Sequence, residues 1–410
     1  MKILKKPELL SPAGNAEKMH AAFLYGADAV YLAGSRFGMR AAADNFTVDE
    51  LYQASEYAHA RGKKLYLTVN TMPHGDEYPQ LATFLRAVKD ARLDAMIVAD
   101  LGVMALIRRL IPDMEIHVST QAGIVSAMTA QAFADLGAKR LVLARELTLD
   151  EIMEIRASLP RHIELEAFVH GSMCVSYSGR CMLSNMLTGR DANRGACTQP
   201  CRWSYHLIEE KRPDIPIPIE QTDLGTFVMS SKDMNTISLI PQLVEAGIDS
   251  FKIEGRMKSA YYTAVVTNAY RMALDSYFEN PDAYVFNQAL QRELDSVSHR
   301  EYATGYYQNL PHDTAQLCVK DGYIREKAYF AIAEGEGRDG LARFKQKNKI
   351  KVGDVAELLS PGNVGKAFLI EELYNEKGEA IDAAPHPSEI FYCRVPFEVK
   401  EGDILRSGEQ

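Results

Sequence analysis

The chain has 410 residues, of which 47% are hydrophobic, so it is longer than one ordinary domain and apolar enough for a large core. Its formal net charge of −9 at pH 7 excludes a surface coated in positive charge for non-specific polyanion binding, although a local basic face could still hold RNA. No apolar run reaches the ~20 residues of a membrane helix and no signal peptide is legible, so we expect a cytoplasmic protein without a membrane partner.

Up to about residue 256, short β-branched runs alternate with longer amphipathic stretches, as in successive βα units. Eight runs read as strands: residues 8–11, 29–32, 64–68, 95–98, 116–119, 140–143, 165–169 and 251–254. Helical periodicity fills gaps between them, for example at residues 15–25, 47–61, 78–91, 101–111 and 127–136. The sequence predicts an α/β fold, a TIM-like (β/α)8 barrel. An open doubly wound sheet is the alternative, but residues 11–15 after the first strand lack its GxGxxG turn.

The stretch between the seventh and eighth strands is long, which predicts a cysteine-rich insertion over about residues 171–230, with a hairpin formed by residues 203–207 and 226–230. Helical patterns follow at residues 261–277 and 283–297. From about Leu317, short alternating runs separated by turns predict a small C-terminal all-β barrel. We therefore expect a barrel domain over residues 1–312 and an all-β domain over residues 313–410.

Polar residues that directly follow the strands are candidates for an active site, because such barrels place their sites at the carboxyl ends of the strands. They are Ser11, Asn15, Asn70, Thr71, Asp100, Ser119, Thr120, Gln121, Arg145, Glu146, His170, Lys252, Glu254 and Arg256. Singly, each could instead cap a helix or shape a loop. The alternation of Lys252, Glu254 and Arg256 indicates either a structural ion network or a site for a small dianion.

Four cysteines follow the seventh strand with the spacing C-x6-C-x15-C-x3-C: Cys174, Cys181, Cys197 and Cys201. In a reducing compartment, clustered thiols more often bind metal than form disulfides. A four-sulfur site holds zinc or an iron–sulfur cluster. Zinc commonly uses two close cysteine pairs, whereas only the second pair is close here, so the spacing favours a cluster. Four unligated buried thiols are the remaining alternative, and Cys318 and Cys393 are interpreted as core residues.

A hydrolase would need Cys174 or Ser172 as nucleophile and His170 as base. Residues two to four apart on one loop rarely reach that geometry, and neither a GxSxG elbow nor an HExxH helix is present. Two basic stretches, Arg180, Arg190, Arg194 and Arg202 in the insertion and residues 343–351 in the β domain, are either solvated faces or RNA contacts.

Residues 166–184 contain the pattern E-x-F-x2-G-S-M-C-x4-G-x-C-x-L-S, which resembles the signature of the collagenase-like family known as U32 peptidases. Residues 7–14, 25–31, 145–147 and 252–256 also resemble that family. The resemblance covers essentially the whole chain. Within the family, the chain is most similar to the branch that hydroxylates the wobble uridine of tRNA. Other branches hydroxylate ribosomal RNA or, with a homologous partner subunit, a ubiquinone precursor, and some members are known as collagenases.

The resemblance implies an oxygen-independent, prephenate-dependent hydroxylation that makes 5-hydroxyuridine in the tRNA anticodon loop. It also implies a 4Fe-4S cluster, for which Cys174, Cys181, Cys197 and Cys201 are the candidate ligands. Prephenate carries two carboxylates, so Arg145, Lys252 and Arg256 with the neighbouring His170 are its candidate partners. Together with Glu254 they form the predicted catalytic group.

Overall fold

The computed structural model describes residues 5–40, 43–203, 221–222, 225–226, 231–308, 324 and 327–408. The chain divides into two compact units. The first comprises Met1–Met19, Ala27–Lys258 and His299–Tyr323, and the second comprises His20–Gly26, Ser259–Ser298 and Ile324–Gln410. The predicted domain boundary after residue 312 lies outside the described residues. Helical residues 259–298 belong with the second unit.

Eight parallel strands form a closed barrel in the first unit. They are β1 (Glu8–Pro12), β2 (Ala29–Ala33), β3 (Lys64–Val69), β4 (Ala95–Val98), β5 (Ile116–Val118), β6 (Arg140–Val142), β7 (Glu164–Ser172) and β11 (Ser250–Ile253). Each strand pairs with the next in sequence, and β11 pairs with both β7 and β1, which closes the barrel. The predicted TIM-like barrel is confirmed, and closure excludes the open doubly wound sheet.

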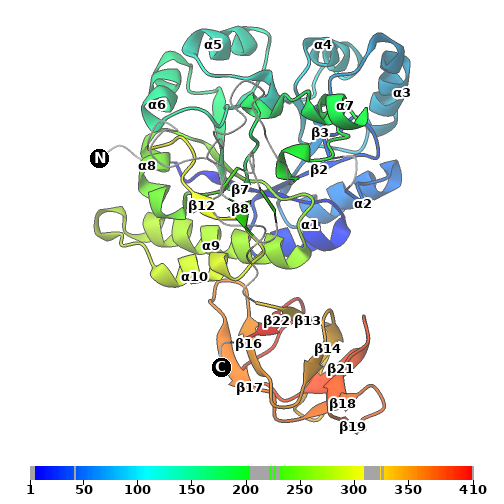
Figure 1. Cartoon of the computed structure of the whole chain (residues 1–410). Helices are drawn as coiled ribbons and strands as arrows, with labels where there is room; N and C mark the ends of the chain where they lie inside the picture. Colours follow the sequence, from blue (N-terminus) through cyan, green and yellow to red (C-terminus); the bar gives the residue numbers. More distant parts are fainter. Residues whose placement is uncertain are drawn as a thin grey trace. The chain divides into compact units, whose positions relative to one another are not determined.

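Helices follow most strands of the barrel and lie outside it (Figure 1). They are α1 (Ala16–Leu24), α2 (Val48–His59), α3 (Tyr78–Val88), α4 (Leu101–Leu110), α5 (Ala127–Asp135), α6 (Leu149–Ser158) and α8 (Ile240–Glu245). Local sequence fixes several starts: Thr47 and Thr148 each form a capping box with a glutamate three residues later. None of the described helices is long and apolar enough to cross a membrane.

The cysteine-rich insertion begins where β7 ends. β7 continues beyond the barrel to pair antiparallel with β10 (Asp233–Asn235), which in turn pairs with β12 (Tyr302–Ala303). A short helix, α7 (Leu183–Thr188), lies within the insertion. Most of the predicted hairpin lies outside the described residues. A two-residue pairing of β8 (Gln221–Thr222) with β9 (Gly225–Thr226) is described there.

A buried ion network fills the interior of the barrel at the amino ends of its strands. The guanidinium of Arg140 lies 2.6 Å from the carboxylate of Glu8, 2.7 Å from that of Glu164 and 3.1 Å from that of Glu166. Glu166 is fully buried and also accepts a 2.6 Å hydrogen bond from Nζ of Lys252. The network therefore links the floor of the barrel to Lys252, which lies nearer its carboxyl end.

The second unit combines two helices with an antiparallel sheet. The helices are α9 (Ala260–Glu279) and α10 (Gln288–Asp295). The sheet is a half-barrel whose strands run in the order β17 (Lys366–Leu369), β16 (Val355–Leu359), β22 (Ile404–Ser407), β13 (Tyr329–Ala333), β14 (Ala342–Gln346), β21 (Ile390–Cys393), β18 (Leu373–Asn375) and β19 (Ala380–Ile381). A small pairing of β15 (Ile350–Lys351) with β20 (Ala383–Ala384) accompanies it. These strands confirm the predicted C-terminal all-β fold.

Arg406 joins the sheet to the helices within this unit. Its guanidinium is 1% exposed and bonds Glu293 of α10 at 2.7 Å and Glu357 of β16 at 2.8 Å. It also donates to the hydroxyl of Ser296 at 3.0 Å. Because a buried arginine needs partners for most of its donors, these contacts fix the strand against the helix.

Candidate functional site

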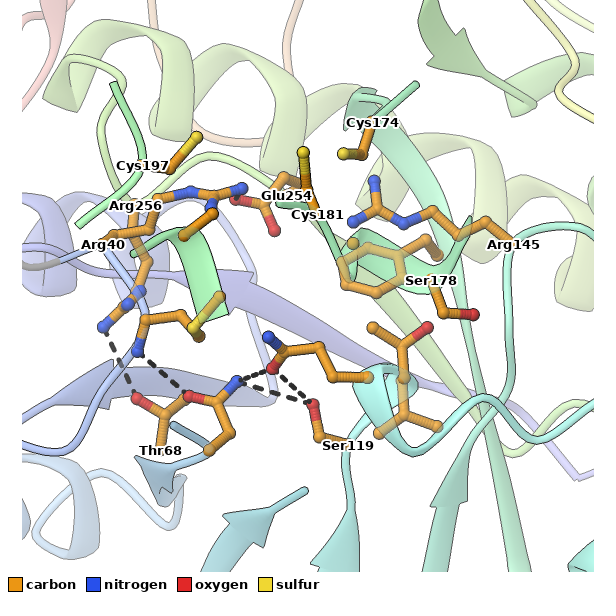
Figure 2. Close-up of a pocket in the computed structure, with 18 of the residues that line it drawn as sticks. Arg40, Thr68, Ser119, Arg145, Cys174, Ser178, Cys181, Cys197, Glu254 and Arg256 are labelled. Atoms are coloured by element: carbon orange, nitrogen blue, oxygen red, sulfur yellow. Dashed lines mark hydrogen bonds and ion pairs between the residues drawn. The ribbon is translucent and has the colours of Figure 1, made fainter. Parts of the chain in front are cut away.

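A cavity opens at the carboxyl ends of the barrel strands. Its wall includes residues from the ends of β2, β3, β5, β7 and β11 and from the cysteine-rich insertion. Figure 2 shows the sulfurs of three cysteines along one side of the cavity and the side chains of Thr68 and Ser119 along the other. The carboxyl ends of the strands, where such barrels place their sites, therefore surround a cavity in this structure.

A half-buried carboxylate surrounded by arginines lies in this cavity. Glu254 forms an ion pair with Arg40 at 3.8 Å, and Arg145 and Arg256 also line the cavity. Burial alone would raise the pKa of Glu254, but the guanidinium groups of Arg40, Arg145 and Arg256 hold that pKa below its usual range. Glu254 is therefore an anion at neutral pH.

Two of these arginines are fixed by contacts with the barrel. Arg145 donates to the carbonyl of Ser172 at 2.7 Å and lies 4.2 Å from the centre of the Phe168 ring. Arg256 is 3% exposed and donates to Thr68 Oγ1 at 3.5 Å. Burial lowers the pKa of Arg256 to about 10, so the side chain stays charged at neutral pH.

Lys252 also lines the cavity, but its charge is already compensated. Its ammonium group bonds Glu166 and lies 4.5 Å from the centre of the Tyr31 ring. The described charged groups of the wall are therefore four cations and one carboxylate, and Glu166 neutralises one of the cations. With the four thiols of the wall neutral, an excess of two positive charges remains, which suits a doubly charged anion.

The opposite wall is neutral and polar. Thr68 and Asn70 come from the end of β3, and Ser119 and Gln121 follow β5. Asn70 Nδ2 donates to Gln121 Oε1 at 2.8 Å, and Ser119 Oγ donates to the same oxygen at 3.3 Å. Asn70, Ser119 and Gln121 were predicted at this rim, and they form one hydrogen-bonded group.

All four predicted cysteine ligands line the cavity. Cys174, Cys181 and Cys197 each accept a hydrogen bond at Sγ from the backbone N–H two residues later, at 3.3 to 3.4 Å. Burial raises the pKa of the Cys201 thiol, and the other three sulfurs raise it further, so the four groups are electrostatic neighbours. Backbone N–H groups aimed at sulfur stabilise thiolate character and are one way proteins tune iron–sulfur clusters.

Positive-φ residues and side-chain hydrogen bonds fix the backbone of the insertion near these cysteines. Ser178 and Gln199 adopt left-handed backbone conformations, with φ of 48° and 57°, although neither is glycine. Ser178 is held by the Glu146 carboxylate, which accepts its N–H at 2.6 Å. Asn193 holds Cys181 by accepting its N–H at 3.2 Å and donating to its carbonyl at 3.1 Å.

The described part of the chain contains no group of three His, Cys, Asp or Glu side chains that could hold a single metal ion. Four thiols around one cavity, three of them with N–H donors, nevertheless fit the donor set of a 4Fe-4S cluster. Cluster and metal binding by these cysteines stay predictions.

The His170 backbone lies beside Glu254, whose N–H donates to the His170 carbonyl at 2.8 Å, but its side chain does not join the other predicted catalytic residues. It is not among the residues that line the cavity. Its buried ring lies 5.4 Å from the ring of Tyr302, on β12. Burial lowers the pKa of His170 to about 3, so the imidazole is neutral. The position gives no support to a catalytic role beside the cysteines.

The basic stretches are partly neutralised. Arg194 forms an ion pair with Glu77 at 2.7 Å. In the second unit, Glu334 lies 3.7 Å from Arg343 and 3.5 Å from Lys345. Arg190 is exposed on the insertion. These ion pairs favour the interpretation of the basic stretch in the β domain as a solvated face. On the insertion, exposed arginines remain that could contact RNA.

Comparison with known proteins identifies the family. The model of peptidase family U32 matches residues 14–317, and that of the U32 C-terminal domain matches residues 325–406. The chain belongs to peptidase family U32. It is 38% identical over 408 residues to tRNA hydroxylation protein P1 of Bacillus subtilis, which covers 99% of this chain and 96% of that protein.

Two other relatives share this similarity. The chain is 36% identical over 437 residues to tRNA hydroxylation protein P of Escherichia coli, covering 96% of this chain and 95% of that protein. It is 39% identical over 272 residues to the 23S rRNA 5-hydroxycytidine C2501 synthase of Escherichia coli, covering 66% of this chain and 40% of that protein. The predicted membership of the U32 family is thus confirmed.

Sequence reasoning missed Arg40, Thr68 and Glu166. Arg40 lies in the loop after β2, and its position after a barrel strand is the signal that could have indicated it. Thr68 was assigned to the body of its strand. Glu166 was noted only as part of a motif, because nothing local indicates that it pairs with Lys252, 86 residues away.

Proposed function

We propose that this chain is a cytoplasmic, oxygen-independent hydroxylase that converts the wobble uridine of tRNA to 5-hydroxyuridine with prephenate as co-substrate. The observation that supports this most is similarity to two tRNA hydroxylation proteins over nearly the full length of all three chains. The cavity adds the chemical setting: four thiols, an excess of positive charge and a neutral polar wall at one barrel mouth.

Cys174, Cys181, Cys197 and Cys201 would hold a 4Fe-4S cluster. When bound, the cluster supplies one-electron redox chemistry. The N–H groups of Ser176, Leu183 and Gln199 stabilise the sulfurs of the first three ligands. Cys201 has no such donor among the described residues and is the weakest member of the set.

Arg40, Arg145 and Arg256 would bind and orient the dicarboxylate. Arginine offers several N–H donors in a fixed plane and stays charged when buried, so it suits carboxylates in a partly closed cavity. Glu254 keeps these guanidinium groups together, because without a nearby anion they would repel one another. Lys252 is assigned a supporting part, since Glu166 already binds its ammonium group.

Peptide hydrolysis is the second candidate, because the family is named for peptidases. Cysteine or serine peptidases need a base within hydrogen-bond reach of the nucleophile. No histidine is found among the described residues that line the cavity, and the neutral His170 packs elsewhere. Hydroxylation of ribosomal RNA or of a ubiquinone precursor would use the same cluster and cavity with another substrate.

Nucleoside mass spectrometry tests the proposal in cells. A strain that lacks the gene is complemented with wild type, Cys174→Ala or the control Cys393→Ala, and its tRNA is digested and analysed. We expect 5-hydroxyuridine-derived nucleosides with wild type and with Cys393→Ala, whose thiol is buried in the second unit. Equal amounts with and without wild-type protein would refute the function.

A further inference from the structure

The neutral wall of the cavity contains a side-chain amide whose orientation can be deduced. Gln121 is 7% exposed and follows β5, and its neighbour Asn70 follows β3. The oxygen and nitrogen ends of such an amide are distinguished by their hydrogen-bond partners. Here one partner is a backbone group, whose role is not ambiguous.

Met39 N–H can only donate, and it lies 3.1 Å from Asn70 Oδ1. Asn70 therefore presents Nδ2 to Gln121, and Gln121 must answer with Oε1, which accepts at 2.8 Å. Ser119 Oγ donates to the same oxygen at 3.3 Å. The direction of every hydrogen bond in this group thus follows from one main-chain donor.

The consequence is that Gln121 offers its Nε2 hydrogens to the cavity. No described residue accepts a hydrogen bond from Nε2, although the side chain is more than nine-tenths buried. A donor that a bound ligand covers without accepting its hydrogen bond is costly, so a ligand with an acceptor at this point is favoured over one without. The backbone is fixed too, because Arg180 Nε donates to the Gln121 carbonyl at 2.7 Å.

We infer that Gln121 selects uracil over cytosine by donating to a carbonyl of the flipped-out target base. The inference rests on the proposed function and deepens it. Uracil carries a carbonyl at C4, whereas cytosine carries an amino group there. A Gln121 amide held with Nε2 towards the cavity can donate to the C4 carbonyl of uracil. The amino group of cytosine is itself a donor and would face Nε2 unfavourably. A base in a single-stranded RNA loop has no pairing partner to lose, so turning it into a cavity costs less than extruding a base from a duplex.

One unmade hydrogen bond to a buried donor corresponds to about a 10- to 100-fold loss in kcat/KM. We therefore expect wild type to prefer uridine over cytidine by about this factor. The same donor could instead meet a carboxylate oxygen of the dicarboxylate. The two occupants differ in which kinetic constant responds to a change at Gln121.

The test uses iron-loaded protein, prephenate and two anticodon stem-loops that differ only in the wobble base, uridine or cytidine. Gln121→Glu keeps the acceptor that faces Asn70 and replaces Nε2 by an acceptor. Asn70→Asp leaves Gln121 unchanged but replaces the Nδ2 donor that faces it by a carboxylate oxygen. Gln121 then turns its amide so that Nε2 donates to this oxygen and Oε1 faces the cavity. We expect both variants to lose the preference for uridine and to gain 5-hydroxycytidine product.

Gln80→Glu is the matched control, because it makes the same chemical change on the exposed surface of α3 and should alter nothing. Thermal unfolding checks that each variant is folded, and a misfolded Gln121→Glu leaves Asn70→Asp to decide.

An active wild type whose base preference is the same in the folded variants overturns the inference and leaves the proposed function standing. A raised KM for prephenate with unchanged base preference also overturns it. A wild type that hydroxylates neither stem-loop removes the proposed function and the inference with it.

Discussion

Replacing Arg140 by methionine removes the guanidinium that joins three carboxylates inside the barrel. Arg140 is 2% exposed and lies within 3.1 Å of Glu8, Glu164 and Glu166. Methionine fills a similar space but offers no charge, so the carboxylates lose their shared partner. Breaking a buried ion pair in this way costs about 3–5 kcal/mol.

The lowered pKa of Glu8 corresponds to a contribution of similar size to the free energy of unfolding. Burial alone would raise this pKa, but Arg140 and a hydrogen bond from Tyr66 lower it from 4.5 to about 2. A carboxyl group with that pKa gains about 3 kcal/mol of folding stability at neutral pH. Because the folded pKa is the lower one, this stability is present above pH ~4.5 and is lost as the pH falls towards 2.

Lys5→Met is the matched control, because Lys5 contacts Glu164 at 3.6 Å but is 74% exposed. Such a surface pair contributes under about 1 kcal/mol. Urea unfolding of both variants at pH 7 and at pH 4, followed by circular dichroism, measures the difference. We expect a large loss for Arg140→Met at pH 7 that shrinks at the lower pH. A loss no greater than that of Lys5→Met, or one independent of pH, would contradict the assignment of Arg140 as the central ion of the barrel.

Three further substitutions test other parts of the molecule. Cys174→Ala should abolish most of the iron and the visible absorption of anaerobically purified protein, whereas Cys393→Ala should keep both, because Cys393 is a buried thiol of the second unit and burial raises its pKa to about 12; equal iron in the two variants would exclude Cys174 as a ligand. Arg256→Met should raise KM for prephenate about 10- to 100-fold in steady-state kinetics, since it removes a charge-assisted contact, and an unchanged KM would take Arg256 out of the binding site. Arg406→Met should destabilise the second unit by about 3–5 kcal/mol in hydrogen exchange, while Arg394→Met, in an exposed pair with 58% of the arginine side chain accessible, should cost under about 1 kcal/mol; similar protection in both would refute the buried network.

The barrel could be predicted from the sequence because its strands are buried on both faces. Such strands are continuous apolar runs, and each of the eight is followed by a turn or helix signal. The carboxyl-end rule then directed attention to Asn70, Ser119, Gln121, Arg145 and the segment after β11. These residues could be placed at the rim from the sequence, because each directly follows a strand and such barrels form their sites at the carboxyl ends of the strands.

Contacts between distant strands could not be predicted in the same way. The ion pair of Lys252 with Glu166 depends on the register of β11 against β7, which local sequence does not encode. Arg40 reaches Glu254 only through the path of an irregular loop. His170 was grouped with the cysteines by proximity in the chain, but its ring packs against Tyr302 instead.

Some rim residues turned out to have ordinary structural roles. Asp100 caps α4 by accepting the N–H of Val103 at 3.0 Å and also accepts a hydrogen bond from Tyr78. Asn15 accepts the N–H of Lys18 at 3.1 Å at the start of α1. Polar residues after strands serve both as helix caps and as site residues, so only the folded structure separates the two uses.

Reconstitution of the reaction from purified components tests the proposed function most directly. Anaerobically prepared, iron-loaded protein is incubated with unmodified tRNA, with or without prephenate, and the tRNA nucleosides are analysed by mass spectrometry. We expect 5-hydroxyuridine or its derivatives at the wobble position only when prephenate is present. Iron-loaded protein that leaves the tRNA unchanged under these conditions, or that cleaves collagen peptides instead, would contradict the proposal.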